Sequence, residues 1–276
     1  MRWRVLDYRT NNAFENMAVD EAIYSETIRN QSPPTLRFYG WRPTAVSIGY
    51  FQDPENEINF QQCRISGVDV VRRLTGGKAV YHGDEVTYSL VAGHSEKIFP
   101  DRISETYEII SLCLARGLSY LGISACLAPV VKGLTAKEPD LLSCCFSMPS
   151  GNELLSDGRK ICGSAQTRTR GGFLQHGALL MTFDPSLSAS LILVSPTLEQ
   201  SAKLRSSVAA VNELLPAPVS AETLCDVLKK GFIEELGIDL ECGTLTPSER
   251  KLSTRLVEKY KSDAWLWKRE NRSSVK

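Results

Sequence analysis

The dipeptide Asp157-Gly158 places the strongest constraint on the fold of this chain. It interrupts a β-type stretch over residues 153–166, where Asp-Gly is typical of a two-residue hairpin turn because both central positions need positive φ. A second glycine turn at residues 170–172 leads into another β-type run over residues 173–183. The sequence therefore predicts an antiparallel meander over residues 152–184, against which the other elements must pack.

Helical patterns and short β-type runs surround this meander. Asn12 and Glu15 have the spacing of a capping box at the start of a helix over residues 12–29. Further helices are predicted over residues 56–66, 103–121, 199–210, 221–236 and 247–262, and further strands over 35–39, 45–50, 68–73 and 86–91. This mixture predicts an α/β (α+β) fold with mixed β-sheets flanked by helices. We expect one domain over residues 1–276, with a mostly helical portion over 185–276 packed on the sheet.

Composition and charge argue against several classes of protein. Lys plus Arg equals Asp plus Glu, 32 against 32, so the chain lacks the excess of cations on which nucleic-acid binding depends. No run approaches the roughly 18 apolar residues of a membrane span, and the N-terminus shows no signal-peptide pattern. We therefore expect a cytoplasmic protein with neither a nucleic-acid nor a membrane partner.

The cysteines and histidines do not have the spacing of a metal site. The chain has eight cysteines without a Cys-x-x-Cys pair and three histidines, so we expect reduced thiols and no bound metal. The P-loop, the Rossmann glycine motif, the Gly-x-Ser-x-Gly elbow and the His-Glu-x-x-His motif are also absent from the sequence. Nucleotide-binding, serine-hydrolase and zinc-protease functions become less favoured.

Two segments carry cations next to small residues. In residues 72–82, the pair Gly76-Gly77 allows a ligand to approach the backbone closely, and Arg72, Arg73 and Lys78 add positive charge, although a basic hairpin turn explains the same pattern. In residues 157–166, regular strand alternation predicts one shared face for Lys160, Cys162, Ser164 and Gln166. A solvated strand lysine is the plain alternative, and His176 on the next strand is by itself more often structural.

A third segment, residues 144–150, contains adjacent cysteines at the end of a predicted loop over 128–144. A cysteine is usually a small buried hydrophobe, but a loop cysteine near a cation is a candidate nucleophile because the cation lowers the thiol pKa. Long loops inside a compact domain are often functional.

Taken in chain order, these segments resemble the biotin/lipoate ligase and acyltransferase superfamily. Residues 72–82 are similar to its paired-glycine signature, and residues 157–166 to the segment that holds its lysine. Within that superfamily the chain most resembles the cysteine-dependent octanoyltransferases of Gram-positive bacteria. The likeness covers nearly the whole chain and is carried by residues 37–41, 47–52, 145–150, 175–177 and 262–265.

This resemblance implies a single acyltransferase domain that moves an octanoyl group from octanoyl-acyl carrier protein to a lysine of a lipoyl-domain protein, such as glycine-cleavage H protein. It implies Cys145 as the nucleophile and Lys160 as the second catalytic residue, acting as a monomer without ATP or metal. We expect Lys160 to stabilise the thiolate, and Lys160 or His82 to be the base for the acceptor amine. The predicted substrate-binding residues are Arg72, Arg73, Thr75, Gly76, Gly77, His82, Gly163, Ser164, Ala165 and His176.

The sequence departs from the family pattern at two places. Gly83 follows His82 where the family usually has Asp, and Asp84 comes one residue later as a candidate replacement. Ser147-Met148 stands where an Asp-Ala pair is common. The sequence leaves three alternatives open: an ATP-dependent lipoate–protein ligase, an amidotransferase between lipoyl domains, and a non-catalytic acyl-protein binder.

Overall fold

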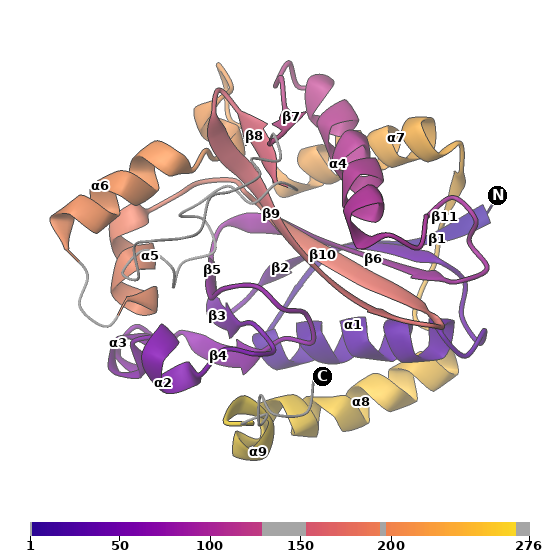
Figure 1. The fold of residues 1–276 in the computed structure, drawn as a ribbon, viewed down its shortest axis with the longest axis horizontal. Coiled ribbons are helices and arrows are strands. Elements are labelled where there is room, and N and C mark those ends of the chain that lie inside the picture. The colour runs from indigo at the N-terminus through magenta and orange to yellow at the C-terminus, as the bar shows by residue number, and fades with distance from the viewer. Residues whose placement is uncertain (1, 129–152, 194–196, 269–276) are drawn as a thin grey trace.

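The computed structural model describes residues 2–128, 153–193 and 197–268, which form two β-sheets flanked by helices (Figure 1). The larger sheet has eight strands. In spatial order they are β11 (Asp239–Cys242), β1 (Arg2–Asn11), β2 (Thr35–Trp41), β6 (Glu85–Gly93), β10 (Gly172–Leu180), β9 (Arg159–Thr169), β8 (Leu154–Ser156) and β7 (Cys126–Leu127). The smaller sheet has the order β4 (Asp69–Arg72), β3 (Ala45–Ile48) and β5 (Val80–His82).

Both sheets mix parallel and antiparallel pairs, which confirms the predicted fold class. β1 runs parallel to β2 and β11, whereas β2, β6, β10, β9, β8 and β7 pair successively in antiparallel fashion. The predicted meander is confirmed as β8, β9 and β10. At its first turn Asp157 and Gly158 have φ values of 50° and 74°, the two positive angles that the Asp-Gly signal requires.

Two pairs of helices cover the two faces of the larger sheet (Figure 1). α4 (Ile103–Ser119) and α7 (Ala221–Leu236) pack together on one face, and α1 (Ala13–Thr27) and α8 (Pro247–Lys261) lie side by side on the other. α1 begins with the predicted capping box, because Asn12 accepts from the Glu15 amide and the Glu15 side chain returns to the Asn12 amide. The shorter helices are α2 (Pro54–Glu57), α3 (Phe60–Ile65), α5 (Pro185–Ile192), α6 (Leu198–Ser207) and α9 (Asp263–Leu266).

The prediction of one helix over residues 56–66 is wrong, because two short helices occupy this region. Ile58 is extended, with φ −144°, and separates α2 from α3. Asn59 then caps α3 by accepting a hydrogen bond from the Gln62 amide. Asparagine competes with helical backbone bonding in this way, so it starts a new helix here rather than continuing the old one.

The interface between α4 and α7 is unusually close because glycines stand on both sides of it. A Cβ atom on Gly231 would lie 2.2 Å from the Cys113 carbonyl oxygen and 2.5 Å from the Gly117 amide nitrogen. Together these helices cover an apolar core that includes Trp3, Phe38, Tyr88, Leu114 and Leu228. Within the described ranges, no helix is both long and apolar enough to cross a bilayer.

We predict that Gly231→Ala destabilises the protein. Alanine favours a helix by about 1 kcal/mol relative to glycine, but the added methyl group forces the two backbones apart, at about 1–3 kcal/mol for overpacking. The expected result is a lower midpoint of thermal unfolding, measured by circular dichroism. The exposed neighbour Lys230 provides the control, because Lys230→Ala changes the same helix without a clash. Equal midpoints for Gly231→Ala and Lys230→Ala would contradict the close packing.

Candidate active site

A cavity of about 390 Å³, counting its open mouth, lies between strands of the two sheets and α1. Six of the predicted site residues line it. The full lining is Met17, Tyr39, Trp41, Ser47, Arg73, Val80, His82, Thr87, Gly163, Ser164, Ala165, His176, Gly177 and Ala178. The cavity lies on the face of the larger sheet opposite α4 and α7. Tyr88 and Cys162 pack under those helices, and the next residues along their strands, Thr87 and Gly163, face the cavity.

Arg73 holds the loop that contains Gly76 and Gly77, called the glycine loop below, at the edge of this cavity. Its Nη2 donates to the carbonyl oxygens of Gly76 and Lys78, at 2.7 and 2.8 Å. Gly77 has a φ of +92°, in the region that favours glycine. The loop also passes close to Gly49, where an added Cβ atom on Gly49 would lie 1.9 Å from the Gly77 carbonyl oxygen. The backbone at this loop therefore requires glycine, as the sequence predicted for a close approach.

Arg72 does not line the cavity, although it was predicted to bind substrate. Its side chain is buried and donates to the carbonyl oxygens of Gly49, Tyr50 and Gln52. It also donates to the Leu266 carbonyl oxygen at the end of α9, at 2.6 Å. Arg72 therefore ties the turn after β3 to the C-terminal helix.

A buried chain of polar groups runs through His176. His176 Nε2 lies 2.7 Å from Thr75 Oγ1, and its Nδ1 lies 3.5 Å from Asp20 Oδ2. Asp20 also accepts from Arg37 at 2.6 Å and from the Tyr39 hydroxyl at 2.9 Å. His176 Nδ1 makes no hydrogen bond within the described residues, but an ionised Asp20 carboxylate 3.5 Å away favours a proton on this nitrogen. Nε2 of a neutral ring with that proton accepts from the Thr75 hydroxyl.

The electrostatics of this chain favour a neutral His176. Burial lowers the pKa of His176 and outweighs the attraction of Asp20, which raises it; the positive charge of Arg73 lowers it further. Burial opposes the ionised form of Asp20 as well, but Arg37 and His176 hold the pKa of Asp20 below its usual value. The site therefore holds a neutral His176 imidazole beside an ionised Asp20 carboxylate.

A second buried chain of polar groups runs through His82, and here both ring nitrogens are in hydrogen-bond contact. Its Nε2 lies 2.7 Å from Ser47 Oγ, and its Nδ1 lies 2.7 Å from Glu85 Oε1. Trp41 stacks on the imidazole, with ring centroids 3.9 Å apart and an interplanar angle of 14°. Glu85, rather than the candidate Asp84, is thus the carboxylate partner of the signature histidine; Asp84 accepts from Thr182 instead.

Lys160 does not share the face that regular alternation predicts. The pairing of β8 with β9 shifts by one residue at Ile161, which is the extra residue of a β-bulge. Ile161 and Cys162 both pack in the core under α4 and α7, so Lys160 turns to the opposite face, which carries the cavity. The prediction that Lys160 and Cys162 lie on one face is wrong for this reason.

The Lys160 ammonium is buried in an ion pair with Glu153, with Nζ 2.5 Å from Oε1. Lys160 precedes the cavity residue Gly163 by three positions, about 10 Å along a strand. The Glu153 carbonyl oxygen accepts from the Ala128 amide at 2.8 Å, so these two residues, between which positions 129–152 lie in the sequence, adjoin beside this pair.

The predicted nucleophile Cys145 and its neighbour Cys144 lie outside the described residues. Burial raises the pKa of the Cys162 thiol to about 12, so this cysteine stays protonated and acts as a packing residue. Among the residues that the structure does describe, no group of three His, Cys, Asp or Glu side chains is placed to hold a metal ion.

Besides the apolar lining of the cavity, sequence reasoning missed four polar partners of the predicted histidines and lysine: Asp20, Ser47, Glu85 and Glu153. One of them carried a usable signal, because Asp20 stands three residues after Met17 on the apolar face of its helix. A carboxylate in that position is costly unless it is paired, so it indicates a buried partner. The other three depend on contacts between separate strands.

Comparisons with known proteins agree on one family. The model of the family described as "Lipoyl protein ligase A/B catalytic domain" matches residues 12–233. An octanoyltransferase LipM from Kyrpidia tusciae is 41% identical over 97% of this chain and 99% of its own length, and one from Geobacillus kaustophilus is 40% identical over 97% and 98%. This chain belongs to the lipoyl protein ligase A/B family. The predicted octanoyltransferase resemblance and acyltransferase class are confirmed by these relatives.

Solved structures of the family share the fold. A lipoate-protein ligase A bound with ATP superposes with a TM-score of 0.80, at 27% identity over 97% of this chain and 99% of that one. A bi-partite lipoate protein ligase from Thermoplasma acidophilum, studied with its E2 lipoyl domain, superposes with a TM-score of 0.79 at 26% identity over the whole of both chains. The fold therefore serves ligases as well as octanoyltransferases.

We predict that His176 makes stability depend on pH. Its folded-state pKa is lowered, so the unfolded chain binds the proton more readily than the native protein does. This contribution is fully present above the unfolded value of about 6.5, and it is lost as the pH falls from there toward the folded value. Urea unfolding between about pH 5 and pH 7.5 should show less loss of stability in His176→Gln than in the wild type.

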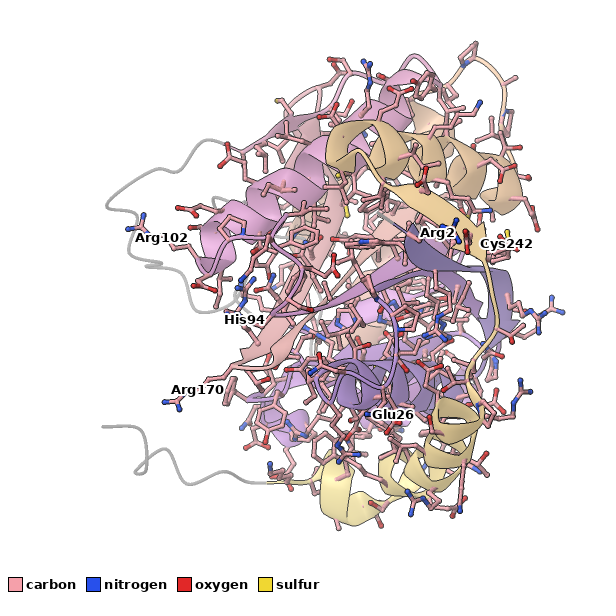
Figure 2. All side chains as sticks on the ribbon, turned by 90° about the vertical axis from the view of Figure 1, so that its right-hand side faces the viewer. Arg2, Glu26, His94, Arg102, Arg170 and Cys242 are labelled. Atoms are coloured by element: carbon pink, nitrogen blue, oxygen red, sulfur yellow. The ribbon has the colours of Figure 1, made fainter. Side chains whose placement is uncertain are left out.

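His94 supplies the matched control for this measurement. It lies at the surface (Figure 2), and its side chain is 61% exposed. His94→Gln should keep the pH dependence of the wild type. A slope that is the same for His176→Gln and the wild type would refute the assignment.

Proposed function

We propose that this chain transfers an octanoyl group from octanoyl-acyl carrier protein to a lysine of a lipoyl-domain protein, such as glycine-cleavage H protein, through a thioester on Cys145. Relatives at 41% and 40% identity are named octanoyltransferases, which supports the acyl group. The observation that carries the proposal is the cavity, which has apolar walls, a glycine loop at its edge, and two buried histidines.

The cavity suits a saturated acyl chain. Met17, Trp41, Val80 and Ala178 provide apolar walls, and Gly163 and Gly177 allow close approach to the backbone. Burying seven carbons at about 0.8 kcal/mol each gives roughly 5–6 kcal/mol of gross attraction. That attraction is sufficient to select for chain length.

The thioester donor explains why we expect no ATP or metal. The acyl carbon of a thioester is already activated, and the enzyme has to supply a thiolate, whereas a free cysteine has a pKa of about 8.5. We assign Lys160, fixed by its contact with Glu153, to stabilising the Cys145 thiolate and the acyl carbonyl. Cys145 precedes Glu153 by eight residues, which span at most about 28 Å, so the chain length allows this approach.

The reaction then proceeds in two steps. The Cys145 thiolate attacks the thioester carbon of the donor, the new C–S bond forms, and the carrier thiol leaves. The acceptor amine attacks the resulting enzyme thioester, an amide bond forms, and the Cys145 thiolate is released. Dividing the transfer in this way replaces one difficult step by two easier ones.

An ATP-dependent ligase is the second candidate, because a lipoate-protein ligase A bound with ATP has the same fold. A ligase would activate a free acid, release pyrophosphate and need no nucleophilic cysteine. An amidotransferase would use the same cysteine with an octanoylated lipoyl domain as donor. Parallel assays with octanoyl carrier protein, octanoate plus ATP, and octanoylated H protein distinguish the three by which donor supports transfer.

We predict an octanoyl adduct on Cys145. Wild-type enzyme mixed with octanoyl carrier protein should gain the mass of one octanoyl group, and hydroxylamine should remove it because thioesters are labile to this nucleophile. Cys145→Ala should form no adduct and lose turnover. The neighbouring Cys144→Ala is the control and should retain both. An adduct that persists in Cys145→Ala, or that Cys144→Ala abolishes, would refute the assignment of Cys145.

We predict that Ala178→Leu shifts the enzyme toward shorter acyl chains. Ala178 lines the cavity, so three added carbons occupy space that the octanoyl chain fills. Each methylene that loses its place costs about 0.8 kcal/mol, or roughly fourfold in kcat/KM. Competition between octanoyl and butyryl carrier proteins measures the ratio. An unchanged ratio would place the acyl chain elsewhere.

A further inference from the structure

A second pocket opens on the face of the larger sheet that α1 and α8 cover. It lies between β1, β2, α1 and the segment that leads from β11 into α8, and it measures about 850 Å³, counting its open mouth. Its charged lining residues are three arginines, Arg9, Arg37 and Arg250, and one acid, Asp7. We call it the arginine pocket. It gathers positive charge in a chain whose net charge is zero.

Helix α1 stands between the arginine pocket and the active-site cavity. Met17 lines the cavity, whereas Val19 lines the arginine pocket. Residues two positions apart in an α-helix are rotated by about 200°, so these two side chains lie on nearly opposite sides of α1. Tyr39 lines both spaces, which adjoin at this residue. A ligand in the arginine pocket therefore occupies a space of its own.

Arg37 is the buried cation of the arginine pocket, with only 5% of the residue exposed. Its Nη1 donates to Asp20 Oδ1 at 2.6 Å and to the Asn16 carbonyl oxygen at 3.1 Å, and its Nη2 donates to Asn16 Oδ1 at 2.7 Å. These three bonds fix the guanidinium in one orientation, which lowers the entropic cost of binding a ligand. A guanidinium has five N–H groups. The other two make no hydrogen bond with the described residues and remain available to a ligand.

A β-bulge brings Arg9 to the same face as Arg37. Leu6 of β1 pairs with Arg37 of β2. The next pair is Arg9 with Tyr39, so two residues of β1 stand opposite a single residue of β2. Regular alternation from Leu6 would place Arg9 on the other face, and the extra residue reverses this. The Arg9 side chain therefore enters the pocket beside Tyr39.

The charges of Arg9 and Arg250 are not neutralised by the protein. Both residues are exposed, and neither side chain forms an ion pair or a hydrogen bond within the described part of the chain. Asp7 is attracted by Arg9, but its carboxylate is already paired with Lys229 at 2.8 Å. Two cations that share one pocket repel each other, and a bound anion removes this repulsion.

This arrangement of donors favours a phosphate group. The three guanidinium groups come from β1, β2 and α8, so they approach the pocket from different directions. A tetrahedral phosphate presents oxygens in several directions, whereas one arginine is enough to bind a planar carboxylate in bidentate fashion. A phosphate monoester carries a charge of about −1.5 to −2 at pH 7, which matches the two arginines without partners.

The pocket has room for more than phosphate. Its volume lies in the range that accommodates small organic ligands, and Leu6, Val19 and Leu245 add apolar surface to its lining. We propose that the arginine pocket binds a small phosphate monoester, with the phosphate between Arg37, Arg9 and Arg250 and the organic part against the apolar residues. The site does not depend on the proposed function.

The test is isothermal titration calorimetry of the full chain with inorganic phosphate and with phenyl phosphate, at constant ionic strength because salt screens surface charges. We expect saturable binding of both, and tighter binding of phenyl phosphate because its ring buries apolar surface. Arg9→Gln and Arg250→Gln should each weaken binding by about tenfold, as expected for the loss of one hydrogen bond to a charged group.

Two variants provide the controls. Arg255 is an exposed arginine on α8 outside the pocket lining, so Arg255→Gln removes the same charge and should keep the wild-type affinity. Ala178→Leu narrows the active-site cavity and should also keep the affinity for phenyl phosphate. Circular dichroism of each variant confirms that it is folded.

The possible results separate clearly. Absence of saturable binding to the wild type, or equal weakening in Arg255→Gln and the two pocket variants, overturns the site. Weaker binding of phenyl phosphate to Ala178→Leu overturns it as well, because the ligand then lies in the active-site cavity. Equal affinities for the two probes overturn the assignment to an ester and identify inorganic phosphate as the ligand.

Discussion

The guanidinium of Arg73 is the contact on which the rest of the site depends. It donates to the hydroxyls of Ser47 and Thr75, which lead to the two histidines, and to two carbonyl oxygens of the glycine loop. Burying such a charge is costly, and a rigid planar group with five donors recovers more of that cost than a lysine would. One side chain thereby fixes the cavity edge and the orientation of both imidazoles, so the site is organised before any substrate arrives.

Elements with their own turn or cap chemistry could be predicted from the sequence. The Asp157-Gly158 hairpin and the Asn12 cap are local signals, and both appear in the structure as expected. β1 gave no such signal, because Arg4 interrupts its apolar pattern. The Arg4 charge is buried against Glu249 at 2.6 Å, and the two residues are 245 positions apart in the chain. A contact of that kind cannot be inferred from a strand's own residues.

The same distinction between local and distant signals holds in the site. The paired glycines and the segment around Lys160 can be recognised from their composition, and six of the predicted site residues line the same cavity. Glu85 and Ser47 could not be found in this way, because β3, β5 and β6 have to come together before His82 acquires its two partners. The β-bulge at Ile161 was equally invisible, since a strand with an extra residue has no special composition.

The β-bulge at Ile161 separates two parts of β9 whose side chains lie in different environments. On one side of Ile161 the strand presents Lys160 to the cavity face, and on the other side it presents Cys162 to the hydrophobic core. Removal of Ile161 would restore regular alternation and would leave Lys160 and Cys162 on their present faces. Removal of a residue beyond the bulge, such as Gly163, would instead move every following side chain of the strand to the opposite face. The strand can therefore lose its extra residue without exchanging these two environments, whereas a deletion further along would turn cavity-facing positions toward the core.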